Sequence, residues 1–221
     1  DLQNLNASER LTLGYVNTKG NIGLETNYSI QSSDLSGDLK LSGKVYINGS
    51  ISLGDDLIVE SSTGINSGYQ ITADGLQLLG AGNFTFSNTN NQINTLAAGL
   101  SSSPLGNISL KNNKALSIGS VIESGINTTG TIEIETYDSD ITISENIVTT
   151  SNDSNAIQIF ADVNEASGSE GEGNIIVSGT PSGWTKVIRE DNRRRRRENR
   201  AGRKANQIGI CRIVVVSKYI W

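Results

Sequence analysis

The sequence has 221 residues, a formal net charge of −5, one Cys, and no His or Met. A single Cys, Cys211, excludes an internal disulfide framework and a Cys-rich metal site, and the absence of His removes the commonest general base and metal ligand. No apolar run approaches the roughly 18 residues of a membrane span, so we expect no transmembrane segment. Because residue 1 is Asp rather than Met, we expect an internal fragment or a processed product.

Charge divides the chain into two regions. Residues 1–184 carry six basic and 20 acidic residues, a net of −14, whereas residues 185–221 carry 12 basic and three acidic residues, a net of +9. Such asymmetry indicates segments of different kinds. We therefore predict one repeat region over 1–184 and a separate basic tail over 185–221.

Short runs of alternating apolar residues recur through the first region. Most have an apolar residue on each side of a central one, so in a strand two side chains face inward and one faces outward. The runs are 11–13, 22–24, 39–41, 45–47, 51–53, 57–59, 76–78, 84–86, 108–110, 116–118, 132–134, 141–143, 157–159 and 175–177. Runs this short cannot bury an apolar face alone, so similar runs must stack above and below them.

The runs also recur at a longer interval, and Gly, Asn and Asp fill the corners between them. The starting residues of successive runs lie 18, 19, 24, 25 and 18 residues apart: Leu39 to Leu57, Leu57 to Leu76, Ile108 to Ile132, Ile132 to Ile157, and Ile157 to Ile175. An irregular period near 20 predicts an all-β fold, a parallel β-helix solenoid. The structural alternative is a β-sandwich, whose strands are usually longer. Two longer corners, 97–106 and 165–173, are expected to project as loops.

Several segments resemble the repeats of filamentous-haemagglutinin-like bacterial adhesins, which are large surface or secreted exoproteins exported by a two-partner or related route. The similar segments are 106–110, 130–136, 140–144, 155–162 and 173–179. The resemblance covers most of residues 35–183 and is one of repeat style. It implies a right-handed parallel β-helix, a location outside the cytoplasm, export through an outer-membrane transporter, and a shaft that displays adhesive regions. The family's amino-terminal secretion domain is not recognisable here, so no transport residue is carried over.

The basic tail lacks the alternating pattern and is predicted to be irregular or helical. Five consecutive arginines at 193–197 could form a basic arm for anionic surfaces, but interleaved aromatics for base stacking are missing, so specific nucleic-acid binding is not predicted. A linker to a following domain is a second hypothesis. The third hypothesis, which we favour, is a shifted reading frame. The alternating apolar pattern ends and the sign of the net charge reverses abruptly after Trp184. The apolar run 208–216 is too short to span a bilayer and could form a strand.

Two acidic pairs are candidates for chemistry. Glu133 and Glu135 would point the same way from one strand, about 7 Å apart, which falls within the carboxylate separation of inverting glycoside hydrolysis. A solvated strand face is the plainer interpretation, since Lys114 is the only basic residue in 112–184 to hold an acidic sugar. Asp55 and Asp56 could bind a hard cation such as Ca²⁺ through oxygen atoms.

Other candidates have simpler explanations. Asp138 and Asp140 could also bind a cation, but corner aspartates more often cap backbone amides. Asn-x-Ser/Thr triplets such as those at Asn48, Asn107 and Asn127 arise by chance in so Asn- and Ser-rich a chain. Cys211 has no His to activate it as a nucleophile. We therefore predict no catalytic, cofactor or metal residues and leave the ligand-binding residues unassigned.

The resulting functional hypothesis is structural. The chain is expected to be part of the shaft of a secreted or surface-attached bacterial adhesin, with host or environmental glycans or proteins as its partners, and not an enzyme. The alternative is a β-helical polysaccharide lyase or hydrolase, for which Glu133 or Glu135 should lie beside Lys111 or Lys114 in a cleft. A phage tail-spike or surface-layer rod would share the fold. Neither end of the repeat region has a recognisable cap, so we expect the natural protein to continue in both directions.

Overall fold

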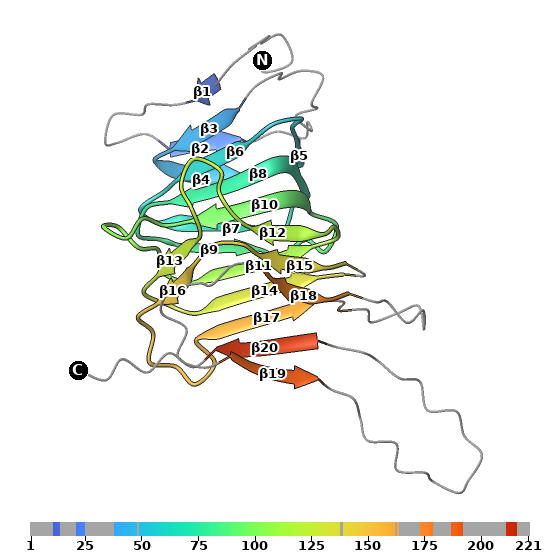
Figure 1. Ribbon diagram of the computed structural model, residues 1–221. Coiled ribbons are helices and arrows are strands. Elements are labelled where there is room, and N and C mark those ends of the chain that lie inside the picture. The colour runs from blue at the N-terminus through green and yellow to red at the C-terminus, as the bar shows by residue number, and fades with distance from the viewer. Residues whose placement is uncertain are drawn as a thin grey trace, which may run out of the picture.

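The computed structural model describes residues 38–47, 49–137, 139–161, 163 and 173–178, together with the backbone of strands at 11–13, 21–24, 187–191 and 211–215. These residues form a parallel β-solenoid in which successive turns of the chain stack along one axis (Figure 1). No helix occurs among them. Seven strands from β3 to β18 follow one another along one side, so the described chain makes about six turns.

The strands belong to three sheets. Sheet I has eleven strands: β1 (Leu11–Leu13), β3 (Leu39–Ser42), β5 (Ile51–Ser52), β6 (Leu57–Glu60), β8 (Ile71–Leu79), β10 (Gln92–Ala98), β12 (Leu116–Ile118), β13 (Ile126–Thr128), β15 (Ile141–Ile143), β16 (Ile147–Thr149) and β18 (Ile175–Val177). Sheet II has seven: β7 (Gly64–Ser67), β9 (Asn83–Phe86), β11 (Ile108–Asn112), β14 (Ile132–Thr136), β17 (Ile157–Ala161), β19 (Val187–Asp191) and β20 (Cys211–Val215). The third sheet pairs β2 (Asn21–Leu24) with β4 (Lys44–Ile47).

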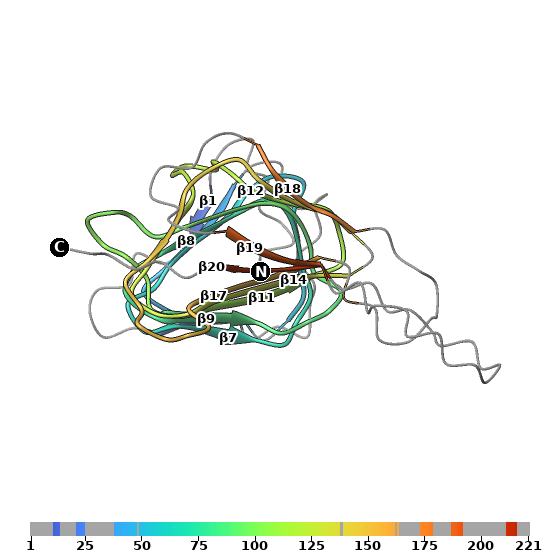
Figure 2. The ribbon, with the colours of Figure 1, turned by 60° about the horizontal axis from the view of Figure 1, so that its bottom comes forward.

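Sheets I and II lie on opposite sides of the rod, as the end-on view shows (Figure 2). In Figure 1 the strands of sheet I run leftward in front, the parallel strands of sheet II such as β14 and β17 run rightward behind, and the chain descends the page, which makes the coil right-handed. This hand is the one that parallel crossover connections adopt, because the twist of L-residue strands favours it. The prediction of a right-handed parallel β-helix is confirmed, and the sandwich alternative is wrong.

The strand register explains the repeat intervals. Leu39 pairs with Leu57 and Leu57 with Leu76 in sheet I, and Ile132 pairs with both Ile108 and Ile157 in sheet II. The predicted intervals of 18, 19, 24 and 25 residues are therefore true turns of the coil. The last predicted interval, Ile157 to Ile175, is wrong because these residues belong to different sheets. Ile175 pairs with Ile141, so this turn contains a longer insertion.

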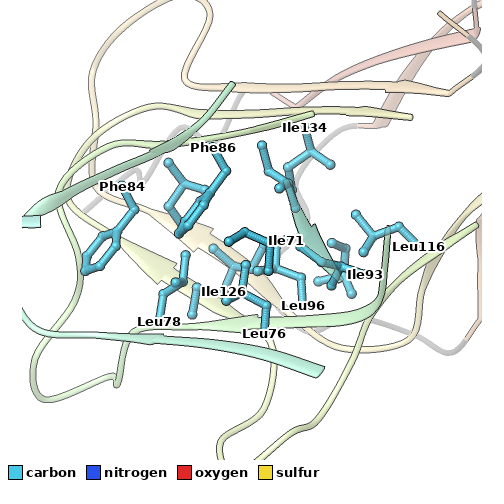
Figure 3. Close-up of a cluster of buried hydrophobic side chains, with 14 of the residues drawn as sticks. Ile71, Leu76, Leu78, Phe84, Phe86, Ile93, Leu96, Leu116, Ile126 and Ile134 are labelled. Atoms are coloured by element: carbon cyan, nitrogen blue, oxygen red, sulfur yellow. The ribbon is translucent and has the colours of Figure 1, made fainter. Parts of the chain in front are cut away.

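The interior is a continuous column of aliphatic and aromatic side chains. Phe84, Phe86, Leu76, Leu78 and Ile134 point into the space between the two sheets and are fully buried (Figure 3). Each inward residue lies directly above and below inward residues of the neighbouring turns, as the register requires. Full burial of one such side chain contributes about 1.5–3 kcal/mol. Stability therefore accumulates from turn to turn, as expected for a solenoid in which each repeat contacts only its neighbours.

Asparagine side chains fix the corners between sheets. Inside the coil, Asn91 Oδ1 accepts a hydrogen bond from the Ile71 amide and Asn112 Oδ1 accepts one from the Ile93 amide, at 2.7 and 2.9 Å. On the outside, the Asn83 side chain accepts from the Asn107 amide in the next turn at 2.8 Å. These bonds satisfy backbone groups that no strand partner reaches at a corner. They also lock one turn onto the next.

Close packing at these outer corners requires glycine. Gly106 precedes Asn107 and lies against the Asn83 side chain, where a Cβ would fall 2.2 Å from Asn83 Oδ1. One turn later, Gly130 lies against the Asn107 side chain in the same way, and a Cβ there would fall 2.0 Å from Asn107 Oδ1. The Gly-Asn and Gly-Thr pairs of the sequence are thus contacts between turns as well as bends of the chain.

Several sequence expectations are corrected. Ala97 and Ala98 were expected in a loop at 97–106, but they end strand β10 and are fully buried. Strands β7, β13 and β16 were not predicted, because each contains one or two aliphatic residues beside small polar ones. A second loop was predicted at 165–173. All of its residues except Gly173 lie outside the described residues, so the structure does not test this prediction.

Two segments of the basic tail are described, and both are strands rather than the irregular or helical chain expected. β20 pairs antiparallel with β17, the last parallel strand of sheet II, and β19 pairs antiparallel with β20. The expected strand within 208–216 is confirmed at Cys211–Val215. The arginine run at 193–197 lies outside the described residues.

Candidate functional site

A polar cluster on the outside of sheet II contains one member of the predicted carboxylate pair. Glu135 on β14 lies directly opposite Lys111 on β11, and the Lys111 Nζ is 3.2 Å from Glu135 Oε2. The Tyr137 hydroxyl donates to the same carboxylate oxygen at 3.2 Å and accepts from Lys111 Nζ at 3.5 Å. All three groups therefore share one small network.

Proton affinities within this network are shifted by the contacts. Burial would lower the pKa of Lys111, but the hydrogen bonds and negative charge that it meets at Glu135 and Tyr137 outweigh burial and raise the pKa above 10.5. Burial, followed by the charge of Glu135, raises the pKa of Tyr137 above 10.0 against the opposing effect of Lys111. At neutral pH the lysine is therefore an ammonium ion and the tyrosine a neutral hydroxyl, so neither is prepared to act as a base.

The two glutamates of the predicted pair, Glu133 and Glu135, have different neighbours. Glu135 is engaged by Lys111 and Tyr137, whereas Glu133 lies between Ser109 and Gln158 of the neighbouring turns. One half of the criterion for the enzyme hypothesis, an acid beside Lys111, is met. The acid and the lysine meet as cross-strand neighbours on a sheet face, an arrangement that also serves as an ordinary ion pair between turns.

A second cluster forms at the corner that leads into sheet I. Carboxylate oxygens of Asp38, Asp55 and Asp56 all lie within 4.8 Å of one another. Burial, together with the charges of Asp38, Asp55 and Asp74, raises the pKa of Asp56 above 3.8, although the Gly75 amide opposes the shift by hydrogen bonding. The predicted pair Asp55–Asp56 is thus enlarged by residues from the turns on either side. Three such oxygens could together hold a hard cation.

The other acidic candidates act as caps. Asp140 Oδ1 accepts hydrogen bonds from the backbone and side-chain amides of Asn174, at 2.5 and 3.3 Å, which is the capping role expected of a corner aspartate. Asn107, in one of the Asn-x-Ser/Thr triplets, accepts from the Thr131 amide. Asp138, Asn48 and the side chain of Cys211 lie outside the described residues.

A loop that sequence reasoning missed crosses the outside of sheet I. We call residues Gly119–Gly125 the strap; it leaves β12, rises over the front of the sheet and returns to β13 (Figure 1). Its base is closed by a 2.8 Å hydrogen bond from the Gly125 amide to the Gly119 carbonyl. The amides of Ile122 and Glu123 donate to Gln77 Oε1 at 3.2 and 2.9 Å, two turns back along the rod.

The strap accounts for an unusual buried column on the outside of the sheet. Ile58, Gln77 and Ala97 are in register and point away from the core, yet their exposed fractions are 1%, 0% and 0%. Val121 of the strap lies close to Gly75, where a Cβ would fall 2.9 Å from both of its methyl groups. The strap therefore lies over this column and beside Asp56, whose Oδ1 would also be 2.4 Å from that Cβ. The Nε2 of Gln77 is buried without a hydrogen-bond partner among the described residues.

The fold defines a class of architecture, the parallel β-solenoid. Comparison with protein-family models, with curated proteins and with solved structures finds no match to this chain. Among the described residues, no helix is long and apolar enough to cross a membrane.

Proposed function

We propose that this chain is part of the shaft of a secreted or cell-surface bacterial adhesin and displays binding regions for attachment. The observation that carries the proposal is the continuous stacking of turns around a column of buried apolar side chains. Each turn adds about 4.8 Å of length. The similarity of the repeats to filamentous-haemagglutinin-like exoproteins supports the same function.

The proposed mechanism is mechanical. Hydrogen bonds between strands run along the rod axis, so a pull along the rod loads many of them together. The Asn83–Asn107 and Asn107–Thr131 corner bonds add side-chain links between turns. Charged groups on the outer faces, such as the Lys40–Glu60 pair at 2.8 Å, keep the surface soluble.

Export by an outer-membrane transporter is part of the proposal. Because each turn contacts only its neighbours, a solenoid can fold progressively as the chain emerges. The single Cys means that no internal disulfide has to form during this process. Partners on the far side would be glycans or proteins of a host or environmental surface.

The experiment compares bacteria that carry and lack the gene. Antibodies against the purified chain should label intact cells or the culture medium, and deletion of the gene should reduce attachment to a surface. An adjacent transporter gene would agree with this result. Labelling confined to the cytoplasmic fraction, or unchanged attachment after deletion with restored expression as the control, would refute the proposal.

The Lys111–Glu135 contact favours a second candidate, a polysaccharide lyase or hydrolase. A lyase needs a cation to neutralise the uronate carboxylate and a base to remove the neighbouring proton. Lys111 is a cation, but it is already neutralised by Glu135. Incubation of the full chain with alginate and polygalacturonate, followed by assay of unsaturated products and reducing ends, tests this candidate. Activity that disappears in Glu135→Gln would establish it, whereas absence of turnover would leave the shaft proposal standing.

A further inference from the structure

We propose that the outer face of sheet II binds a neutral polysaccharide that lies along the rod axis. This inference rests on the proposed attachment function and names the surface and the class of ligand. We define the sheet II outer face by the outward residues Asn66, Thr85, Ser109, Glu133 and Gln158, which follow one another in strands β7, β9, β11, β14 and β17.

The first argument is accessibility. Each of these five side chains is exposed or partly exposed, whereas the corresponding column of sheet I, with Gln77 at its centre, is buried under the strap. Figure 2 places β7, β9, β11 and β17 on the opposite side of the rod from β12 and β18. The sheet II outer face is therefore free of a cover such as the one that the strap forms over Ile58, Gln77 and Ala97 in sheet I.

The second argument is the kind and spacing of its groups. The five residues provide amides, hydroxyls and a carboxylate, which donate and accept hydrogen bonds as sugar hydroxyls do. Strand register places one such group per turn, at intervals of about 4.8 Å along the axis. A straight array of this kind spans about 20 Å and suits an extended polymer of hydroxylated units rather than a compact ligand.

The third argument is the aromatic residue at the amino-terminal end of the face. Tyr46 points outward from β4, between the buried Val45 and Ile47, and 41% of its surface is exposed. The element β4 lies beside β7, so Tyr46 extends the same face. An exposed tyrosine offers a flat apolar ring with a polar tip, which suits the apolar face and hydroxyl rim of a sugar ring.

Charge selects a neutral polymer. The Lys111 ammonium group is paired with Glu135, and the remaining lysine of this face, Lys44, lies over the Tyr46 ring at 5.6 Å from its centroid. Together with Glu133, the face carries two ammonium and two carboxylate groups, so it has no excess positive charge to hold a polyanion. Uncharged polysaccharide is therefore favoured over uronate or sulfated chains.

The experiment measures retardation of the full chain in native gels that contain a polysaccharide: xylan, mannan or hydroxyethyl cellulose as neutral probes, and alginate or heparin as anionic probes. We expect retardation by at least one neutral probe and less by the anionic ones. Thr85→Leu, which replaces a hydroxyl in the middle of the face by aliphatic bulk, should weaken the neutral interaction about two- to tenfold. Tyr46→Ala should weaken it about two- to tenfold.

The matched control is Thr142→Leu, which makes the same change at an outward position of sheet I. It should change binding by less than about twofold, because it lies on the other side of the rod. Glu133→Lys should add binding to alginate at low salt, because it supplies the missing positive charge. Circular dichroism and unfolding midpoints of each variant should match those of the parent.

Three results would overturn the inference: no retardation by any neutral probe, stronger retardation by alginate or heparin, or equal losses in Thr85→Leu and Thr142→Leu. None of these would affect the attachment experiment with intact cells. Conversely, the purified chain could bind a neutral polysaccharide while deletion of the gene leaves cell attachment unchanged. This result would support the glycan-binding face of sheet II and refute the adhesin proposal. The two failures are therefore distinguishable.

Discussion

Sheets I and II have the same inner construction but opposite outer surfaces. In both, inward residues such as Leu76 and Ile134 stack in register and are fully buried. Outside, the column that contains Gln77 is covered by the strap, whereas the column that contains Ser109 is open to solvent. The comparison teaches that the interior of a solenoid follows from its repeat, while its outer faces depend on individual loops.

The largest expected effect comes from placing a charge under the strap. Ile58→Lys should lower the free energy of unfolding by about 2–4 kcal/mol, because it removes a buried side chain and forces the ammonium group out past the strap. Thr85→Lys, at an outward position of sheet II, should change it by less than about 0.5 kcal/mol. Urea unfolding of both variants measures the difference. Equal midpoints would mean that the strap does not cover Ile58 in solution.

A smaller effect should follow from releasing the strap without adding charge. Gln77→Leu removes the acceptor for the Ile122 and Glu123 amides, so we expect a loss of about 1–2 kcal/mol. Hydrogen exchange at these two amides should accelerate. Gln158→Leu, at an outward position of sheet II, is the matched control and should leave both amides protected. Unchanged exchange in Gln77→Leu would show that other contacts hold the strap.

The acidic cluster beside the strap predicts a dependence on pH. The pKa of Asp56 is raised in the folded protein, so the folded state holds this proton more tightly than the unfolded state does. The stabilisation that protonated Asp56 provides is complete below pH 3.8 and is lost as pH rises through the folded-state pKa.

Asp56→Asn should consequently be more stable than the parent at pH 7, and this advantage should disappear below pH 3.8. Thermal unfolding across pH 3–8 measures it, with Asp153→Asn, outside the cluster, as the control. A parent that is the more stable protein at pH 7 would contradict the prediction.

The smallest expected effect concerns the ion pair of sheet II. Because both partners are partly exposed, Glu135→Gln should cost only about 0.2–1 kcal/mol, and less at high salt. It should also lower the pKa of Tyr137, since the charge of Glu135 raises it in the parent. Ultraviolet titration of the tyrosines follows this change, with Glu133→Gln as the matched control. An unchanged titration in Glu135→Gln would mean that the two side chains are separated in solution.

Much of the candidate site was within reach of the sequence. The 18- and 19-residue intervals that relate Leu39 to Leu57 and Leu57 to Leu76 also relate Asp38 to Asp56 and Asp55 to Asp74. Applied to the outward residues, these intervals would have predicted the acidic cluster. The 24-residue interval likewise places Lys111 against Glu135.

The strap had a fainter signal. Ile58 and Ala97 are apolar at outward positions, where Lys40, Ser117 and Thr142 are polar. Such residues indicate a cover but do not say which segment provides it. The strap comes from residues 45 and 46 positions beyond Gln77, a separation that no local pattern encodes.

The sequence by itself determined the parallel coil, the turn intervals and the inward columns, because alternation of apolar residues and a repeated period leave one way to bury these side chains. Only the tertiary structure decided which outer face is covered, which segment covers it, and where the tail strands β19 and β20 pair. These features depend on the paths of loops between turns, and a loop path is fixed by contacts with distant residues rather than by the periodicity of its own sequence.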